Sequence, residues 1–183
     1  MLGSLEEAIE IYEAMGDYFK EDRLPAGWEY LGAGGTRTAY LSPSGVVYKV
    51  CRSYPATEPS DNDTEHSNFG FIRESGKLPD GWRVPDSHLW VFDGLYRDYD
   101  YELAVVVHER RIAVLACEYI EGEAYGTLFK SLCTEAEEIE LEKAFYAVGL
   151  SDTCLPNAIR CINGYSYIID AAEEPLFRVL QAA

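Results

Sequence analysis

The first part of the chain has the hydrophobic pattern of one amphipathic helix. Apolar side chains recur at helical spacing at Leu5, Ala8, Ile9, Tyr12, Met15 and Phe19. This spacing places them on one face, which we expect to pack against the rest of the domain. Ser4 and Glu7 precede that face with the Ser-x-x-Glu spacing of a capping box, in which each side chain accepts a hydrogen bond from the other residue's backbone N–H. The helix is expected to end before the turn at 24–27.

From Trp28 onward the pattern changes to short β-strands. Runs rich in aromatic and β-branched residues span 28–31, 38–41 and 46–51, and turns that contain glycine or proline separate them. This arrangement predicts an antiparallel meander.

A helix is expected to follow the meander at 63–75, and strands then return. The predicted strands span 88–92, 102–108 and 112–119. A tight turn is expected at 109–111, between the last two strands.

The strand pattern ends at Glu121 and Gly122, which we interpret as a hinge. A short helix is expected at 125–132, and a second capping box at Thr134 and Glu137 predicts the start of a longer helix.

Near the end of the chain, two short apolar runs at 158–162 and 165–169 are joined by Asn163 and Gly164. This dipeptide between apolar runs is a strong signal for a β-hairpin.

These elements predict an α+β fold with three parts. The parts are an N-terminal amphipathic helix (1–24), a lobe with an antiparallel sheet and one helix (25–121), and a reduced, mostly helical lobe (122–183).

Composition narrows the classes of partner. The 183 residues are 48% hydrophobic, enough for a packed core, and carry a net charge of -17. A surface with this charge repels nucleic acids and anionic membranes, so neither is expected as a partner. The five cysteines are scattered without a CxxC motif, and the N-terminus has no secretory pattern, so we expect reduced thiols and a cytoplasmic protein.

Five groups of residues along this pattern are candidates for a functional site. The segment between the first two strands contains Gly32, Gly34, Gly35 and Arg37, and the next apolar strand contains Lys49. The helix that follows contains Glu65, with Glu74 as an alternative. Glu118 and Ile120 precede the hinge, and Asp152, Asn157 and Asp170 flank the final hairpin. Turn glycines, an edge-strand lysine and helix caps would explain each group alone, but not the joint order of all five.

In this order the groups resemble the motifs of the protein-kinase-like superfamily, over about residues 27–170. The resemblance implies a bilobal fold that binds ATP and Mg²⁺. It implies that the glycines hold phosphate through backbone amides. Arg37 replaces the third glycine of the family motif, and it would either contact a phosphate or shield the loop.

The resemblance also implies roles for the other groups. Lys49 would hold the α- and β-phosphates, and Glu65 would pair with it. Backbone groups of Glu118 and Ile120 would bind adenine. Asp152 would be the catalytic base, and Asn157 and Asp170 would bind the metal.

The sequence departs from the family pattern around Asp152 and Asp170. Leu150 and Ser151 stand where the family has His-Arg, and Ala171 and Ala172 stand where it has Phe-Gly. Because 13 residues follow Asp170 in this sequence, we expect neither an activation segment nor the large helices that bind a peptide substrate. We therefore expect a nucleotide site without an identified acceptor site. The reduced motifs are typical of compact viral genomes, such as those of phages.

Three functions follow as alternatives. The first is transfer of the γ-phosphoryl group to a hydroxyl of a protein or small molecule, with AMP transfer as a variant. The second is a catalytically weak pseudokinase that acts as an interaction or inhibitor protein. The third is a scaffold that binds no nucleotide and whose acidic surface occupies the groove of a basic partner. The sequence does not indicate an oligomeric state.

Overall fold

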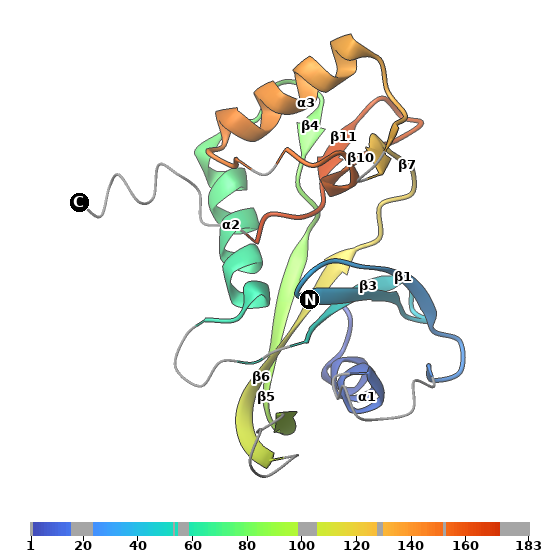
Figure 1. Ribbon diagram of the computed structural model, residues 1–183, viewed down its shortest axis with the longest axis vertical. Coiled ribbons are helices and arrows are strands. Elements are labelled where there is room, and N and C mark those ends of the chain that lie inside the picture. The colour runs from blue at the N-terminus through green and yellow to red at the C-terminus, as the bar shows by residue number, and fades with distance from the viewer. Residues whose placement is uncertain are drawn as a thin grey trace, which may run out of the picture. The chain divides into compact units, whose positions relative to one another are not determined.

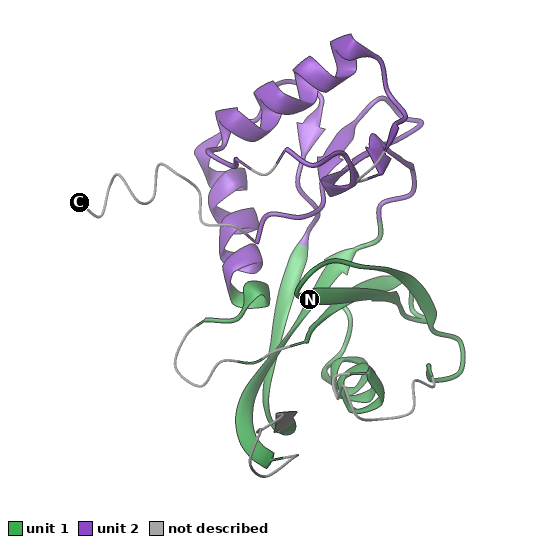
Figure 2. Cartoon of the chain, in the orientation of Figure 1, with its two compact units in different colours: residues 1–63, 87–119 green, residues 64–86, 120–183 purple. Residues whose placement is uncertain are grey.

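The computed structural model describes residues 2–15, 24–52, 54, 59–98, 106–127, 130–151 and 153–172 (Figure 1). The chain divides into two compact units (Figure 2). Unit 1 comprises Met1–Asp63 and Ser87–Tyr119, and unit 2 comprises Thr64–Asp86 and Ile120–Ala183. Among the described residues, no helix combines the length and apolar character needed to cross a membrane.

Unit 1 is built on a five-stranded antiparallel sheet in the order β1-β2-β3-β6-β5. Its strands are β1 (Glu29–Ala33), β2 (Arg37–Leu41), β3 (Val46–Cys51), β5 (Ser87–Asp98) and β6 (Val106–Glu118). The predicted meander of the first three strands is confirmed. β3 lies in the centre, and five of its six residues are buried.

The core of unit 1 lies between one face of this sheet and helix α1 (Leu5–Met15). Tyr48 and Val50 of β3 pack there with Ile11 and Tyr12 of α1. The predicted amphipathic helix is therefore confirmed, but its buried face includes Ile11, whereas Leu5 is exposed. Phe19 lies outside the described residues.

The predicted capping box at Ser4 forms only in part. Ser4 Oγ accepts a hydrogen bond from the Glu7 backbone N–H (3.1 Å). The reciprocal bond is replaced, because Ser4 N donates to the Tyr48 hydroxyl (2.8 Å) and that hydroxyl donates to Glu7 Oε2 (2.7 Å). A buried tyrosine thus links both members of the box to β3. Burial, followed by the hydrogen bond to Glu7, raises the pKa of Tyr48.

The turn predicted at 109–111 is wrong. Those residues continue β6, which pairs with β5 without interruption from Ser87↔Cys117 to Asp98↔Val106. Arg111 lies opposite Asp93, and exposed and half-buried residues alternate along this part of β6. Charged residues are therefore compatible with the extended β5–β6 pair, because one of its faces is exposed to solvent. Their polarity alone does not predict a turn.

Unit 2 contains a four-stranded sheet and two helices. The sheet order is β4-β11-β10-β7, from strands β4 (Trp82–Arg83), β7 (Glu123–Ala124), β10 (Ala158–Arg160) and β11 (Ser166–Ile168). Helix α2 (Asp61–Ser75) begins in the last residues of unit 1 and continues in unit 2, and α3 (Glu135–Ala147) follows the first strands after the hinge.

The hairpin predicted around Asn163 and Gly164 is confirmed. β10 and β11 pair antiparallel, and Gly164 adopts a φ of 85°, which favours glycine. The Asn163 side chain accepts a hydrogen bond from Tyr165 N (3.1 Å). Local turn chemistry therefore sets the register of the hairpin.

The capping box predicted for α3 is complete. Thr134 Oγ1 accepts from Glu137 N (3.3 Å), and Glu137 Oε2 accepts from Thr134 N (2.8 Å). The carboxylate of Glu137 also receives a hydrogen bond from Arg160 of β10. Hydrogen bonds from Thr134 and then from Arg160 lower the pKa of Glu137.

The helix predicted at 125–132 is wrong. This region forms two short paired strands, β8 (Gly126–Thr127) and β9 (Lys130–Ser131), with residues 128–129 outside the described part. A Cβ atom on Gly126 would lie 2.6 Å from Lys130 O and 2.7 Å from Leu155 Cδ1. Glycine is therefore required here by close packing, which the apolar pattern does not reveal.

Aromatic rings mark the interior of both units. In unit 1, Trp28 packs against Tyr48 at 5.4 Å between ring centroids. The indole of Trp90 donates to Leu2 O (3.2 Å). In unit 2, Trp82 stacks on Tyr125 at 5.6 Å, and the guanidinium of Arg160 lies over the same tyrosine.

Candidate functional site

The predicted site residues are divided between the two units. Gly32, Gly34, Gly35, Arg37, Lys49 and Glu118 belong to unit 1, and Glu65, Ile120, Asn157 and Asp170 belong to unit 2. Asp152, the predicted catalytic base, lies outside the described residues.

The glycines of the β1–β2 turn are not required by the fold. A Cβ atom on Gly32 or Gly35 would meet nothing within 4 Å, and one on Gly34 would meet only Arg37 O at 3.9 Å. None of the three has the positive φ that favours glycine. The absence of side chains leaves room for an incoming group, but Gly34 N already donates to Arg37 O (2.9 Å), so phosphate contact through that amide would replace a hydrogen bond of the turn.

Arg37 begins β2 as a buried residue opposite Cys51, with 6% of its surface exposed. Its guanidinium lies close enough to lower the pKa of the Cys51 thiol, but burial is the larger effect and raises that pKa to about 11. The sheet thus holds the positive charge of Arg37 beside a neutral thiol.

Lys49 occupies the centre of the sheet, between Ala39 of β2 and Leu115 of β6. Its neighbours Tyr48 and Val50 belong to the core beside α1. Because side chains alternate along a strand, Lys49 is directed toward the opposite face. It is half-buried there.

Burial separates the two glutamates considered for α2. Glu65 is fully buried (0% exposed), whereas Glu74 is exposed. Burying a carboxylate is costly unless charge or hydrogen bonds compensate, so a buried glutamate on a helix requires a specific reason. Glu65 is therefore the stronger candidate of the two.

Two buried asparagines on the same helix were missed by the sequence analysis. Asn62 and Asn68 are spaced by three residues on either side of Glu65, and both are fully buried. Asn62 Nδ2 donates to Lys49 O (2.7 Å), and Asn68 Nδ2 donates to Ala171 O (2.7 Å). Polar residues recurring every three positions were the available signal, because they form one stripe on a helix.

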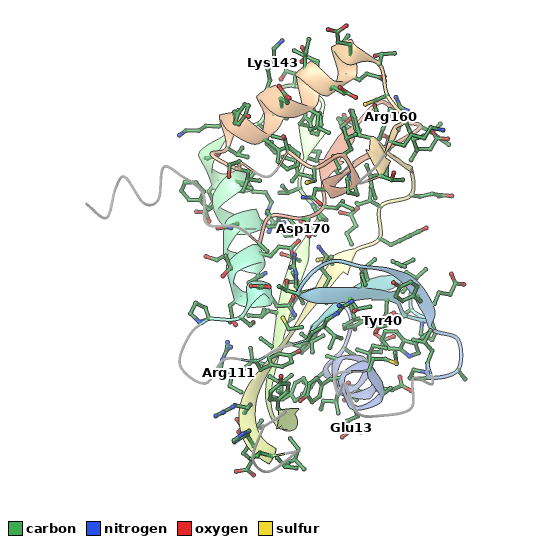
Figure 3. The ribbon with its side chains drawn as sticks, viewed as in Figure 1. Glu13, Tyr40, Arg111, Lys143, Arg160 and Asp170 are labelled. Atoms are coloured by element: carbon green, nitrogen blue, oxygen red, sulfur yellow. The ribbon has the colours of Figure 1, made fainter. Side chains whose placement is uncertain are left out.

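Asn157 and Asp170 are brought together at one end of the β10–β11 hairpin. Asn157 ends the short 3₁₀ helix η1 (Leu155–Asn157), and its carbonyl accepts a hydrogen bond from Ile169 N (2.8 Å). Asp170 follows directly, and its Oδ1 accepts a hydrogen bond from Ala172 N (3.3 Å). Figure 3 labels Asp170 just beyond β11.

The donor set of this pair fits Mg²⁺. Mg²⁺ prefers oxygen ligands and is often held by one or two carboxylates with several waters retained. Asp170 offers a carboxylate and Asn157 an amide oxygen. Among the described residues, no group of three or more His, Cys, Asp or Glu side chains forms a metal cluster. Any metal at Asn157 and Asp170 would therefore also need ligands from its substrate or from water.

The predicted hinge lies where the chain passes from unit 1 to unit 2. Glu118 ends β6 opposite Val46 and is exposed, while Ile120 is buried (8%). Gly122 lies against β10, because a Cβ atom there would collide with Arg160 O and lie 2.6 Å from Ile159 Cγ2.

Comparison with known proteins gives no family assignment. No family profile and no curated protein matches the chain. A solved GDP complex of a point mutant of aminoglycoside 2'-phosphotransferase IIIa aligns with a TM-score of 0.39 and 12% identity, over 80% of this chain and 41% of that chain. An alpha kinase from Entamoeba histolytica aligns with a TM-score of 0.38 and 11% identity, over 93% of this chain and 73% of that chain. The chain thus spans less than half of the phosphotransferase, and TM-scores below 0.5 do not assign it to a family.

Proposed function

We propose that the chain binds ATP and Mg²⁺ and transfers the γ-phosphoryl group to a hydroxyl of a protein or small molecule, in the manner of a protein-kinase-like enzyme. One observation carries this proposal. The backbone hydrogen bond from Ile169 N to Asn157 O places Asn157 opposite the residue before Asp170, so an amide and a carboxylate belong to the same end of the hairpin. An amide oxygen and a carboxylate are ligand types that Mg²⁺ accepts, which supports a metal at that place.

In this proposal, unit 1 provides the contacts to the phosphates. The backbone of Gly32, Gly34 and Gly35 and the ammonium of Lys49 bind phosphate oxygens, with Arg37 as an additional positive charge. Glu65, the buried carboxylate of unit 2, would be the partner that orients the ammonium of Lys49. Backbone groups of Glu118 and Ile120 bind the edge of adenine.

Unit 2 provides the residues for the metal and the proton. Asn157 and Asp170 would hold Mg²⁺, which would supply positive charge to the phosphates. Asp152 accepts the proton of the acceptor hydroxyl, which makes the hydroxyl oxygen a better nucleophile. Local positive charge and metal are required, because a net charge of -17 opposes the approach of an anionic nucleotide.

The proposal is tested first by a binding titration. Mg·ATP at a hundredfold excess over its dissociation constant should raise the free energy of unfolding by about 2.7 kcal/mol. Lys49→Ala and Asp170→Ala should each weaken binding at least about tenfold, a loss of roughly 1.4 kcal/mol. Lys143→Ala on α3 and Asp80→Ala in an exposed loop serve as matched controls and should bind normally. Unchanged stability at millimolar Mg·ATP would refute nucleotide binding.

Turnover separates an enzyme from a binding protein. Asp152→Asn should abolish phosphoryl transfer while it leaves Mg·ATP binding intact. ATP labelled at the α- or γ-phosphate distinguishes AMP transfer from phosphoryl transfer. Binding without turnover in the wild type would instead indicate a pseudokinase that acts through a protein partner.

A further inference from the structure

The pairing of β3 with β6 ends at Lys49. The last registered pair is Lys49↔Leu115, and a continued register would place Cys51 opposite Ala113. The backbone N–H of Cys51 instead donates to the Tyr54 hydroxyl (3.2 Å). The two strands therefore separate directly after Lys49, and the backbone groups that face each other beyond that point need other partners.

The side chain of Asn62 provides these partners. Its Nδ2 donates one hydrogen bond to Lys49 O (2.7 Å) on β3 and one to Ala113 O (2.8 Å) on β6. Both protons of the amide are thus used, one on each strand. Asn62 replaces a step of the backbone ladder at the position where the ladder opens.

The other contacts of Asn62 fix its own place. Its backbone N–H donates to the buried thiol of Cys51, which partly offsets the rise of the thiol pKa caused by burial. The next residue, Asp63, accepts two hydrogen bonds from Arg111 of β6 (2.9 and 2.7 Å). The first turn of α2 is therefore attached to β3 through Cys51 and to β6 through Arg111.

The environment of the Oδ1 atom indicates that the role of the Asn62 side chain lies in the two hydrogen bonds that its Nδ2 donates. Oδ1 is fully buried and accepts no hydrogen bond from any group the structure describes. An unsatisfied buried acceptor is unfavourable. A residue that carries this cost at a fully buried position needs a compensating role, and bridging the Lys49 and Ala113 carbonyls is that role.

We propose that Asn62 is a positioning residue for Lys49. It holds the peptide group after Lys49 at the end of the ladder and so fixes the direction in which the lysine side chain leaves β3. The proposal rests on the proposed function for the role of Lys49 in binding phosphate. The anchoring itself is a property of the ligand-free protein.

The test measures Lys49 directly, without nucleotide. A brief pulse of acetic anhydride followed by peptide mass spectrometry gives the acetylation rate of each lysine, with exposed Lys77 and Lys143 as internal references. In Asn62→Ala, acetylation of Lys49 should rise about fivefold relative to wild type, as expected for easier local opening. Asn62→Ser keeps one donor and should give an intermediate rate.

Ser60→Ala is the matched control. The Ser60 hydroxyl donates to Asp63 Oδ2 (2.7 Å) and accepts from Asp63 N (3.3 Å) in the same turn of α2, and alanine removes both bonds while it leaves the bond from Asn62 to Lys49 O in place. It should change the global stability without changing the acetylation of Lys49. Equal Lys49 rates in Ser60→Ala and Asn62→Ala would overturn the proposal, because Asn62 would then act only on helix stability. If Asn62→Ala does not fold, Asn62→Ser decides in the same comparison.

A Mg·ATP titration of the same variants connects the anchoring to function. The dissociation constant should rise about tenfold in Asn62→Ala and stay unchanged in Ser60→Ala, where tenfold corresponds to roughly 1.4 kcal/mol. A wild-type protein that binds no Mg·ATP would refute the proposed function alone, since the acetylation rates would still decide the role of Asn62.

Discussion

Asp63 shows how one carboxylate can join two elements. Its Oδ2 accepts hydrogen bonds from Ser60, directly before α2, and from Arg111 on β6, and its Oδ1 accepts a second one from Arg111. Burial pushes the pKa of Asp63 upward, but the hydrogen bonds from Arg111 and Ser60 outweigh it and leave the pKa below its ordinary value of 3.8. The ionised form is therefore the one that stabilises the fold.

This arrangement predicts a pH dependence. A carboxyl whose pKa is lowered by folding contributes stability above its unfolded pKa and loses that contribution as the pH falls through the folded value. Asp63→Asn should cost about 1 kcal/mol at neutral pH, a modest value because the Arg111 side chain is 53% exposed, and progressively less as the pH falls below 3.8 and through the folded pKa. Urea denaturation of both proteins across this range measures the difference.

The control is an exposed ion pair in the other unit. Asp86 pairs with Arg73 at 2.9 Å, but 81% of the Asp86 side chain is exposed. Asp86→Asn should leave the pH profile unchanged. Parallel profiles for wild type and Asp63→Asn would contradict the role assigned to Asp63.

At the scale of elements, helix α3 depends on its capping box. Thr134→Ala removes the acceptor for the Glu137 N–H and should lower the free energy of unfolding by about 1 kcal/mol. Urea denaturation measures this loss. Thr36→Ala, at an exposed turn position, is the control and should change stability by less than about 0.5 kcal/mol. Equal effects of both substitutions would show that the box does not stabilise α3.

Two glycines should respond oppositely to the same substitution. Gly122→Ala places a methyl group against β10 and should destabilise unit 2 by about 2 kcal/mol, as overpacking does. Gly32→Ala meets no neighbouring atom and should stay within about 0.5 kcal/mol of wild type. Thermal denaturation of both variants provides the comparison, and a stable Gly122→Ala would mean that β7 can move away from β10.

Elements encoded by local chemistry could be predicted from the sequence. The capping box at Thr134 and the turn at Asn163 and Gly164 each need only neighbouring residues, and both are present. The box at Ser4 failed in part because the hydroxyl of Tyr48, distant in sequence, binds both the backbone N–H of Ser4 and the carboxylate of Glu7.

Elements that depend on distant partners could not be predicted. β4 consists of Trp82 and Arg83, and it is a strand because it pairs in parallel with β11. No local pattern in the sequence predicts this pairing. The bridging role of Asn62 likewise depends on where two strands separate. The resemblance of the motif order to kinases proposes which residues carry the chemistry, but it contains no information on the residues that hold them in place.

At the scale of the whole molecule, the net charge of -17 is the dominant electrostatic feature. Self-repulsion of this size opposes the compact state, and salt screens it over a Debye length of about 8 Å at physiological ionic strength. Raising KCl from about 20 to about 200 mM should therefore increase the free energy of unfolding, by on the order of 1 kcal/mol. A urea midpoint that falls with added KCl would show that ion pairs outweigh the repulsion.

The distribution of the three tryptophans gives each unit its own spectroscopic reporter. Trp28 and Trp90 belong to unit 1, and Trp82, stacked on Tyr125, belongs to unit 2. Replacing Trp28 and Trp90 with phenylalanine would leave Trp82 of unit 2 as the single tryptophan. Replacing Trp82 would leave tryptophan emission from unit 1 alone. Intrinsic fluorescence of these two proteins during denaturation would then reveal whether the units melt in one step or in succession.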